Sequence, residues 1–258
     1  MAMRIPPNAQ KYFDETGDLS RFTWRFFAEG FKPRYEFAEL LRQCFLIGYR
    51  SLPLVGLTGF IMGLVLTMQL RPSLIDYGVE YELPALVAIA IVREIGPVIT
   101  ALIFAGKIGS SIGAELGSMK VTEQIDAMEV SGTNPFKFLV VTRIFACILM
   151  LPILVLLGDA IGLFGCFLGV NIKGVTSFSL FYNQVFDSLS YSDVFPAFFK
   201  TFFFGLAVGV IGCYKGYTSS KGTEGVGRSA NSAVVVSSFM VFVLDLIAVQ
   251  ITDVLGLN

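Results

Sequence analysis

Two oppositely charged residues stand side by side in the middle of an apolar stretch. Arg93 and Glu94 are the eleventh and twelfth residues of LPALVAIAIVREIGPVITALIFAG, a run of 24 residues. Adjacent helical residues point about 100° apart, so the two charges do not neutralise each other on one face. Pro97 follows closely and withdraws a backbone hydrogen bond, which loosens the helix. A polar, kinked midpoint suits a gate or a substrate cavity, and a buried ion pair that holds helices together is the structural alternative.

Four other ionisable residues fall within or near apolar stretches: Arg143, Asp159, Lys200 and Asp245. A charge at the centre of an inserted helix costs roughly 2.5–3.5 kcal/mol on insertion scales. We expect Arg143 and Lys200 to lie near span ends, where long side chains extend to the membrane surface. Asp159 and Asp245 are deeper, and they fit either a structural pair with a basic residue on another helix or a functional role.

The elements that hold these residues follow from composition. The chain has 258 residues, is 54% hydrophobic and 15% charged, and has a mean hydropathy of +0.71, whereas a soluble domain is about one-quarter charged. These values predict an all-α, polytopic membrane protein. The net charge of −1 implies no bulk attraction to nucleic acid. Histidine is absent, which excludes His-based triads and most zinc sites, and no phosphate-binding G-x-x-x-x-G-K-[ST] loop occurs.

Five apolar stretches predict five transmembrane helices, at about 51–70, 83–106, 138–170, 195–214 and 231–252. The third stretch has 33 residues, so it is either one tilted helix kinked at Pro152 or two short helices that turn at Gly158–Asp159. Loop charge favours one helix. With the N-terminus cytoplasmic, the cytoplasmic segments hold eight, three and three Lys or Arg residues, and the outer segments hold only Arg71 and Lys173. We therefore predict five spans with the C-terminus periplasmic.

The first fifty residues (1–50) are predicted to form cytoplasmic or interfacial helices that precede a membrane domain over 51–258. The segment LSRFTWRFFAEGF (19–31) alternates aromatic residues with Arg21 and Arg25, a pattern that suits an amphipathic helix in the headgroup plane. A soluble helix bound to a partner is the alternative. Pro33 is expected to open the next helix, and the polar N-terminus does not resemble a cleaved signal peptide.

Small residues recur at helix-packing spacing. Glycines occur as G-x-x-x-G at 59–63, within 109–117, at 165–169 and at 205–209. This spacing lets helix backbones approach closely in lipid. It predicts that helices pack together, without predicting a dimer. The four cysteines, which include no C-x-x-C pair, are expected to be small packing residues.

A charged, helix-capable segment separates the second and third spans. It covers 110–136 and contains TEQIDAMEVSGTNPF (122–136). Apolar residues recur at helical spacing while acids occupy other faces, and Gly132 and Pro135 end the pattern. A short amphipathic helix of this kind is what a groove on a partner protein accepts. A helix that lies on the membrane surface is the alternative.

The stretch REIGPVITALIFAGKIGSSIGAELGSMKVTEQIDAMEVSGTNPF (93–136) resembles the signature of the MlaE (YrbE-type) permease family. Its members are the membrane subunits of bacterial ABC lipid transporters that work with MCE-domain proteins. The resemblance rests on RE-x-GP, on the A-x-x-F-AG-[KR]-x-G-S-x-x-x-AE-x-G-x-M run, on TEQ-x-x-[AS]-ME and on the NP dipeptide, and it extends at lower density over most of the chain.

The resemblance implies a multi-pass permease of the bacterial inner membrane that moves phospholipids and supports outer-membrane lipid asymmetry. It implies a homodimer whose partners are an ABC ATPase subunit (MlaF-like), an MCE-domain protein (MlaD-like) and a small STAS-domain protein (MlaB-like). ATP would be bound and hydrolysed by the ATPase, so this chain is expected to hold no cofactor or metal and not to be an enzyme. The implied lipid cavity or gate comprises Arg93, Glu94, Tyr77, Leu66, Leu74 and Ile95. The implied ATPase-coupling residues are Glu115, Met119, Glu123, Ile125, Met128 and Glu129.

Two other functions remain open from the residues alone. A secondary transporter or channel would use Glu94, Asp159 and Asp245 as an ion relay, and it would transport without ATP. A membrane anchor that only assembles partners would tolerate the loss of the midplane charges. An intramembrane enzyme has little support, because no nucleophile–base pair is visible.

Overall fold

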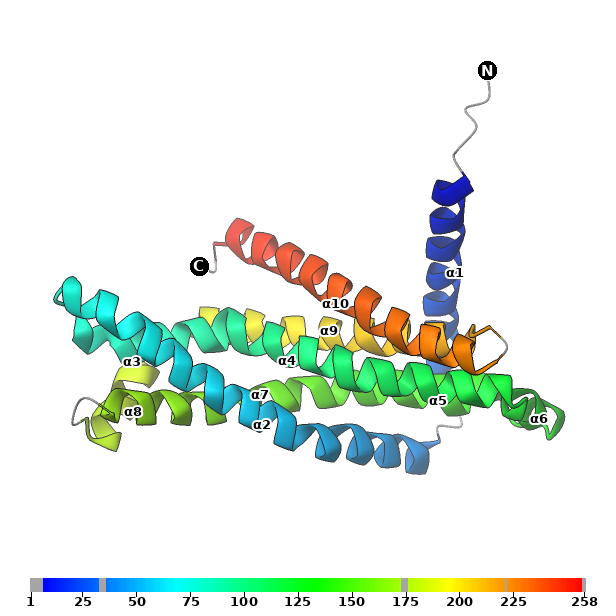
Figure 1. Cartoon of the computed structure of the whole chain (residues 1–258), viewed down its shortest axis with the longest axis horizontal. Helices are drawn as coiled ribbons and strands as arrows, with labels where there is room; N and C mark the ends of the chain where they lie inside the picture. The colour runs from blue at the N-terminus through cyan, green and yellow to red at the C-terminus, as the bar shows by residue number, and fades with distance from the viewer. Residues whose placement is uncertain (1–6, 33–35, 173–175, 221, 257–258) are drawn as a thin grey trace, which may run out of the picture.

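The computed structural model describes residues 7–32, 36–172, 176–220 and 222–256. Within these ranges five helical segments are long and apolar enough to cross a membrane, and they run along one common direction (Figure 1). The segments are Phe37–Asp76, Glu80–Val121, Phe136–Asn171, Tyr191–Tyr217 and Thr223–Val254. Each contains one of the five predicted stretches, so the prediction of an all-α protein with five spans is confirmed.

The helices follow one another as α1 (Pro7–Gly30), α2 (Phe37–Asp76), α3 (Leu83–Ala90), α4 (Gly96–Phe104), α5 (Ser110–Val121), α6 (Gln124–Val130), α7 (Thr142–Asn171), α8 (Phe178–Ser188), α9 (Tyr191–Tyr217) and α10 (Thr223–Val254). Short irregular turns join some of them: η1 (Glu80–Glu82), η2 (Ile91–Ile95), η3 (Ala105–Gly109) and η4 (Phe136–Val141). The last three are π-helical. One end of the bundle carries α6 and the other carries α3 and α8 (Figure 1); we call them the α6 end and the α8 end.

The third apolar stretch is a single helix. α7 continues without a break past Pro152 and through Gly158 and Asp159, so the two-helix alternative does not occur. This helix is the central element of the bundle, because it packs along α2 on one side and along α9 on another. Its burial explains why it carries so few charges.

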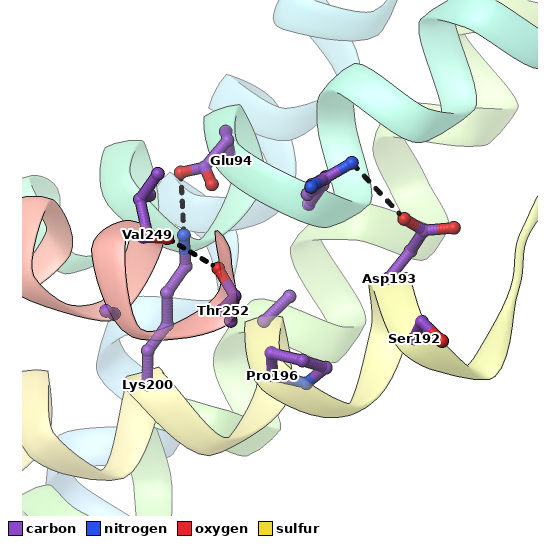
Figure 2. A pocket seen from close by; sticks show the side chains of 10 residues that line it. Glu94, Ser192, Asp193, Pro196, Lys200, Val249 and Thr252 are labelled. Atoms are coloured by element: carbon purple, nitrogen blue, oxygen red, sulfur yellow. Dashed lines mark hydrogen bonds and ion pairs between the residues drawn. The ribbon is translucent and has the colours of Figure 1, made fainter. Parts of the chain in front are cut away.

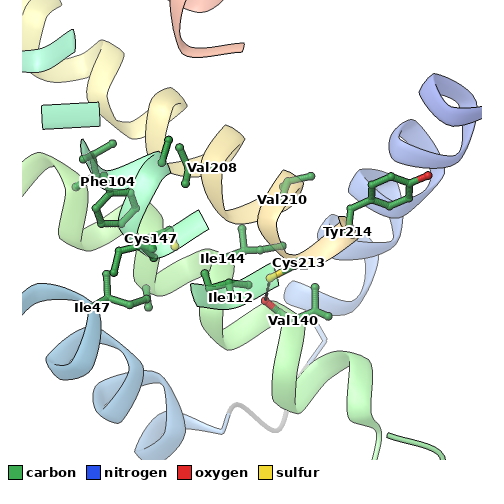
Figure 3. Close-up of a cluster of buried hydrophobic side chains, with 14 of the residues drawn as sticks. Ile47, Phe104, Ile112, Val140, Ile144, Cys147, Val208, Val210, Cys213 and Tyr214 are labelled. Carbon is green, nitrogen blue, oxygen red and sulfur yellow. Dashed lines mark hydrogen bonds between the residues drawn. The ribbon is translucent and has the colours of Figure 1, made fainter. Parts of the chain in front are cut away.

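Glycines let the central helices approach at backbone distance. A Cβ atom on Gly63 of α2 would overlap the carbonyl oxygen of Gly162 in α7, and one on Gly205 of α9 would lie 2.6 Å from the carbonyl oxygen of Cys147. The small-residue motifs therefore pack helices within one chain, as predicted. Around these contacts lies an apolar core that α4, α5, α7 and α9 build (Figure 3). Cys147, Cys166 and Cys213 are buried free thiols, which agrees with a packing role.

α1 lies across the α6 end of the bundle rather than along it (Figure 1). Phe22 and Phe26 are buried there, with the Phe22 ring 5.1 Å from that of Phe136, whereas Trp24 and Phe31 are each 75% exposed on another side. Glu29 accepts a 2.6 Å hydrogen bond from Lys32, and this bond lowers the pKa of the Glu29 carboxyl. The helix thus has one face on the bundle and a separate aromatic face that nothing in the described chain covers.

The next helix differs from the expected division at residue 50. α2 begins at Phe37 and runs for 40 residues without a break, so residues before and after position 50 belong to one rigid element. Pro53 lies inside this helix, and Pro33, expected to open it, lies outside the described residues. Forty residues give a helix about 60 Å long, roughly twice the hydrocarbon thickness of a bilayer.

Candidate functional site

A partly buried cluster of charged side chains lies in the half of the bundle toward the α8 end. The Lys200 ammonium donates a hydrogen bond to Glu94 Oε2 at 2.7 Å (Figure 2). It donates a second hydrogen bond to Asp245 Oδ1 at 2.8 Å. Beside it, Arg93 Nη1 lies 3.5 Å from Asp193 Oδ1. The cluster joins three spans, because its members come from η2, α9 and α10.

Local backbone features place these side chains. Pro97 has no N–H to donate to the carbonyl of Arg93, and the preceding turn widens to a π-turn in which the Gly96 N–H bonds the carbonyl of Ile91. The predicted loosening of the helix near Pro97 is therefore real, and it lies in the turn that carries Arg93 and Glu94. These two side chains have different partners, as expected from their angular separation.

Asp193 was not among the residues that the sequence singled out. It is the third residue of α9, where its carboxylate accepts a hydrogen bond from the Ser190 backbone N–H at 3.0 Å. Its other oxygen faces Arg93. The signal was present as the S-x-x-D pattern at 190–193, which precedes an apolar run and marks a helix start.

The positions expected for Lys200 and Arg143 were wrong, because both residues are buried. Lys200 and Arg143 were expected to extend from span ends to the membrane surface, but their residues are only 6% and 2% exposed. Arg143 instead donates to the carbonyl of Leu139 and pairs with Glu115 at 2.8 Å. The reason is that α7 and α9 are central helices, so their long side chains meet other helices before they meet the headgroups.

Asp245 and Asp159 have different surroundings. Asp245 pairs with Lys200, which is the structural pairing considered for it. Asp159 is buried against Gly96, and its Oδ1 has no hydrogen-bond partner among the described residues. Asp159 lines a cavity of about 320 Å³ between α2, α4 and α7, which shares no lining residue with the cavity at Glu94.

A small polar cavity opens at the charged cluster, with a volume of about 290 Å³. Figure 2 shows the side chains around it, which come from the π-turn η2, the first turns of α9 and the last turns of α10. A larger apolar groove of about 990 Å³ runs between α9 and α10 directly beside it. The cavity and the groove share the lining residues Pro196, Lys200, Ala248 and Thr252. Charge and apolar surface therefore meet along one continuous depression.

The walls of this groove are aromatic and aliphatic. Phe195, Phe199 and Phe203 line it from α9, and Ile247 and Ile251 line it from α10. These residues repeat at helical spacing, so each helix presents one apolar stripe to the groove. Such a surface can hold hydrocarbon, while the adjoining cavity can hold a polar or charged group.

The structure separates the six residues expected at a lipid cavity. Arg93 and Glu94 line the polar cavity, but Ile95 lines the cavity of Asp159. Leu66 and Leu74 pack against a core cluster of α3, α7 and α8. Tyr77 directly follows the last residue of α2 and is 82% exposed. Within the single chain, only Arg93 and Glu94 of these six residues line the same cavity.

The segment between the second and third spans forms α5 and α6. Glu123 joins them in a left-handed conformation with a φ of 58°. α6 ends at Val130, and Gly132, two residues later, has a φ of 80°. The Thr133 N–H bonds the Met128 carbonyl and the Gly132 N–H bonds that of Glu129, the pattern of a glycine-terminated helix. A short helix is therefore present in the predicted segment, and it stops just before the glycine that was expected to end it.

The apolar face of this segment packs on the chain itself. Ile125 is 1% exposed, and Met119 and Met128 are partly buried against the main core. Glu123 and Glu129 are exposed, as is Val130 at 91%. Glu115 forms the ion pair with Arg143 described above. The surface that α6 offers to another molecule is therefore its acidic side with Val130.

Comparisons with known proteins agree on one family. The family model described as "Permease MlaE" matches residues 40–251. A probable ABC transporter permease of Rickettsia typhi is 36% identical over 93% of this chain and 93% of its own length. The intermembrane phospholipid transport system permease protein MlaE of Haemophilus influenzae is 38% identical over 84% of both chains. A probable ABC transporter permease of Synechocystis is 36% identical over 79% of this chain and 77% of its own.

Proposed function

Because the chain belongs to the MlaE permease family, we propose that it is the permease subunit of an ABC transporter that moves phospholipids. The phospholipids would pass between the bacterial inner membrane and a periplasmic MCE-domain protein. This transport would maintain the lipid asymmetry of the outer membrane. The observation that carries the proposal is the polar cavity that joins the apolar groove of α9 and α10. A phospholipid has a charged head and hydrocarbon tails, and this depression offers a matching surface to each.

The charged cluster would receive the head group during passage. A polar group crossing the hydrocarbon needs partners that replace water. Arg93, Glu94 and Lys200 would supply them in the half of the bundle toward the α8 end. We expect Glu94→Ala and Arg93→Ala each to slow lipid transport and to weaken the stimulation of the ATPase by lipid. Normal rates and normal stimulation in both variants would exclude it.

ATP hydrolysis would come from a separate MlaF-like ATPase, which docks on α6. The exposed acidic side of α6, with Glu129 and Val130, faces away from the bundle at the α6 end. Glu129→Lys and Val130→Asp should each reduce the amount of ATPase that copurifies with the permease. Glu224→Lys is the matched control, since Glu224 is an exposed carboxylate in the first turn of α10 at the same end of the bundle. Equal recovery of ATPase in all variants would contradict docking at α6.

The distribution of basic residues supports one orientation of the bundle in the membrane. Lys120, Lys137, Lys215 and Arg228 are at the α6 end, which supports a cytoplasmic α6 end, a cytoplasmic N-terminus and a periplasmic C-terminus. An MlaD-like MCE protein would then meet the α8 end, and an MlaB-like STAS protein would accompany the ATPase. A homodimer is part of the proposal, and the outward sides of α2 and α10 are largely exposed and apolar.

The ion-relay alternative gains no support from the geometry. Asp159 and Glu94 line separate cavities, and Asp245 is held by Lys200. The first experiment is to purify the tagged chain in mild detergent from its native membrane and to identify every associated protein and lipid by mass spectrometry. An ATPase, an MCE-domain protein and phospholipid in stable proportion are expected. Recovery of the chain alone, without ATPase or lipid, would overturn the proposal in favour of a transporter that works by itself.

A further inference from the structure

Among the described residues that line the cavity between α2, α4 and α7, Asp159 is the only one with a titratable side chain. The others are apolar residues, glycines and the two threonines Thr58 and Thr100. Asp159 is 7% exposed, and no part of the chain that the structure describes forms a hydrogen bond or an ion pair with its carboxyl group. A carboxylate in such surroundings costs far more free energy than a neutral carboxylic acid.

Gly96 lets this carboxyl group lie against the π-turn η2. A Cβ atom on Gly96 would overlap Asp159 Oδ1 and would lie 2.8 Å from the carbonyl oxygen of Ile91. Two oxygens therefore converge on one point beside Gly96. The Ile91 carbonyl already accepts the Gly96 N–H, but a carbonyl oxygen has a second lone pair. A carboxylate can only accept hydrogen bonds, so the two oxygens repel each other unless a donor lies between them.

A proton on Asp159 would account for both features, because a neutral carboxylic acid brings no charge into the cavity and has an O–H donor. We propose that Asp159 holds a proton and donates a hydrogen bond to the Ile91 carbonyl, which fixes the π-turn η2. The same turn carries Arg93 and Glu94 to the other cavity, so Asp159 is a positioning residue for them. The proton is held rather than relayed, since the two cavities share no lining residue. The effect of this bond on transport rests on the proposed function, whereas the proton itself does not.

Infrared spectroscopy detects this proton directly, because a protonated carboxyl group has a carbonyl-stretch band that an ionised one lacks. The purified full-length chain is reconstituted in phosphatidylcholine vesicles at neutral pH. The band should be present in the wild-type chain and absent from Asp159→Asn. Asp245→Asn is the matched control, since Asp245 is also in a span but pairs with Lys200, so its loss should leave the band unchanged. Isotope-labelled aspartate should shift the band, which provides a second reading if Asp159→Asn does not fold.

Lipid transport by the complete transporter tests the hydrogen bond. Asp159→Ala removes the donor and should slow transport about tenfold, the factor that corresponds to one hydrogen bond. Asp159→Asn has an amide N–H donor in nearly the same place and should recover most of that rate. An acid loses its proton as the pH rises, so the wild-type chain should lose the infrared band and slow down over the same alkaline range. Asp159→Asn cannot ionise, and its rate should not fall over that range.

The possible outcomes separate the inference from the proposed function. A wild-type chain without the band at neutral pH would overturn the inference. So would loss of the band when sodium replaces choline in the buffer, because Asp159 would then hold a metal cation. Equal loss of transport in folded Asp159→Ala and Asp159→Asn would overturn the hydrogen bond to the π-turn. A chain that shows the band but moves no phospholipid in the complete transporter would instead overturn the proposed function.

Discussion

Lys200 is the residue on which the charged cluster depends. It is 6% exposed and holds two carboxylates from two other helices. Removing one partner of a buried ion pair leaves an uncompensated charge, which costs far more than the pair contributes when it is intact. A lone lysine in a sequence does not reveal this role, because its partners are 106 and 45 positions away along the chain.

We expect Lys200→Met to lower the free energy of unfolding by about 3 kcal/mol, the lower part of the range for a broken buried pair, because Glu94 is partly exposed. The triple variant Lys200→Met, Glu94→Gln, Asp245→Asn should recover most of this loss. Thermal unfolding in detergent measures both. The control is Arg228→Met, whose partner Glu224 and own side chain are exposed, so it should change stability little. A triple variant no more stable than Lys200→Met would refute the electrostatic explanation.

At the scale of the elements, glycine determines how closely the helices pack. α2 and α7 touch backbone to backbone at Gly63 and Gly162, and α7 and α9 do so at Cys147 and Gly205. Interfaces of this kind keep the spans in one register, because any added side chain would force the helices apart. The polar cavity depends on that register, since its residues come from separate spans.

Gly63→Ala should destabilise the fold by roughly 1–3 kcal/mol, since the new methyl group would overlap the carbonyl oxygen of Gly162. Gly106→Ala is the matched control. Gly106 is also in a membrane span, and nothing lies within 4 Å of the position of its Cβ atom. Thermal unfolding of the two variants should therefore differ clearly. Equal losses would show that glycine matters here for backbone flexibility rather than for close approach.

The exposed aromatic face of α1 leads to a second prediction at this scale. Trp24 is the only tryptophan, so intrinsic tryptophan fluorescence reports on α1 alone. If this face lies in the headgroup region, brominated lipids in vesicles should quench the emission strongly. The variant Trp24→Phe with Arg21→Trp moves the indole to an exposed polar position, where iodide in solution should quench it instead. Quenching of native Trp24 by iodide and not by brominated lipid would place this face in water or against a soluble partner.

At the scale of the whole molecule, charge sets the orientation of the bundle. We expect the α6 end in the cytoplasm and the α8 end outside. In a Cys44→Ser background the remaining cysteines are buried, so an introduced cysteine can be labelled selectively. Tyr191→Cys, at a position 94% exposed near the α8 end, should react with an impermeant maleimide on intact cells. Val130→Cys, at a position 91% exposed on α6, should react only after lysis. The reverse pattern would invert the topology.

The sequence by itself determined the five spans, favoured a single third helix and indicated a short helix within the segment 110–136. These features are local, because apolar length, loop charge and turn glycines such as Gly132 act over a few residues. The sequence also identified Arg93 and Glu94 as unusual, and both line the polar cavity. The approximate place of the site was therefore predictable from one stretch of chain.

Only the tertiary structure decided which residues meet. In the tertiary structure Lys200 pairs with both Glu94 and Asp245, and Asp193 lies beside Arg93. Ile95 lines the separate cavity of Asp159 instead. Ile125 of α6 is buried in the core of this chain, although its helical spacing is equally compatible with a groove on a partner protein. The physical reason is that a helical period fixes which residues share a face but not what that face packs against. That choice depends on contacts between spans that are far apart in the chain.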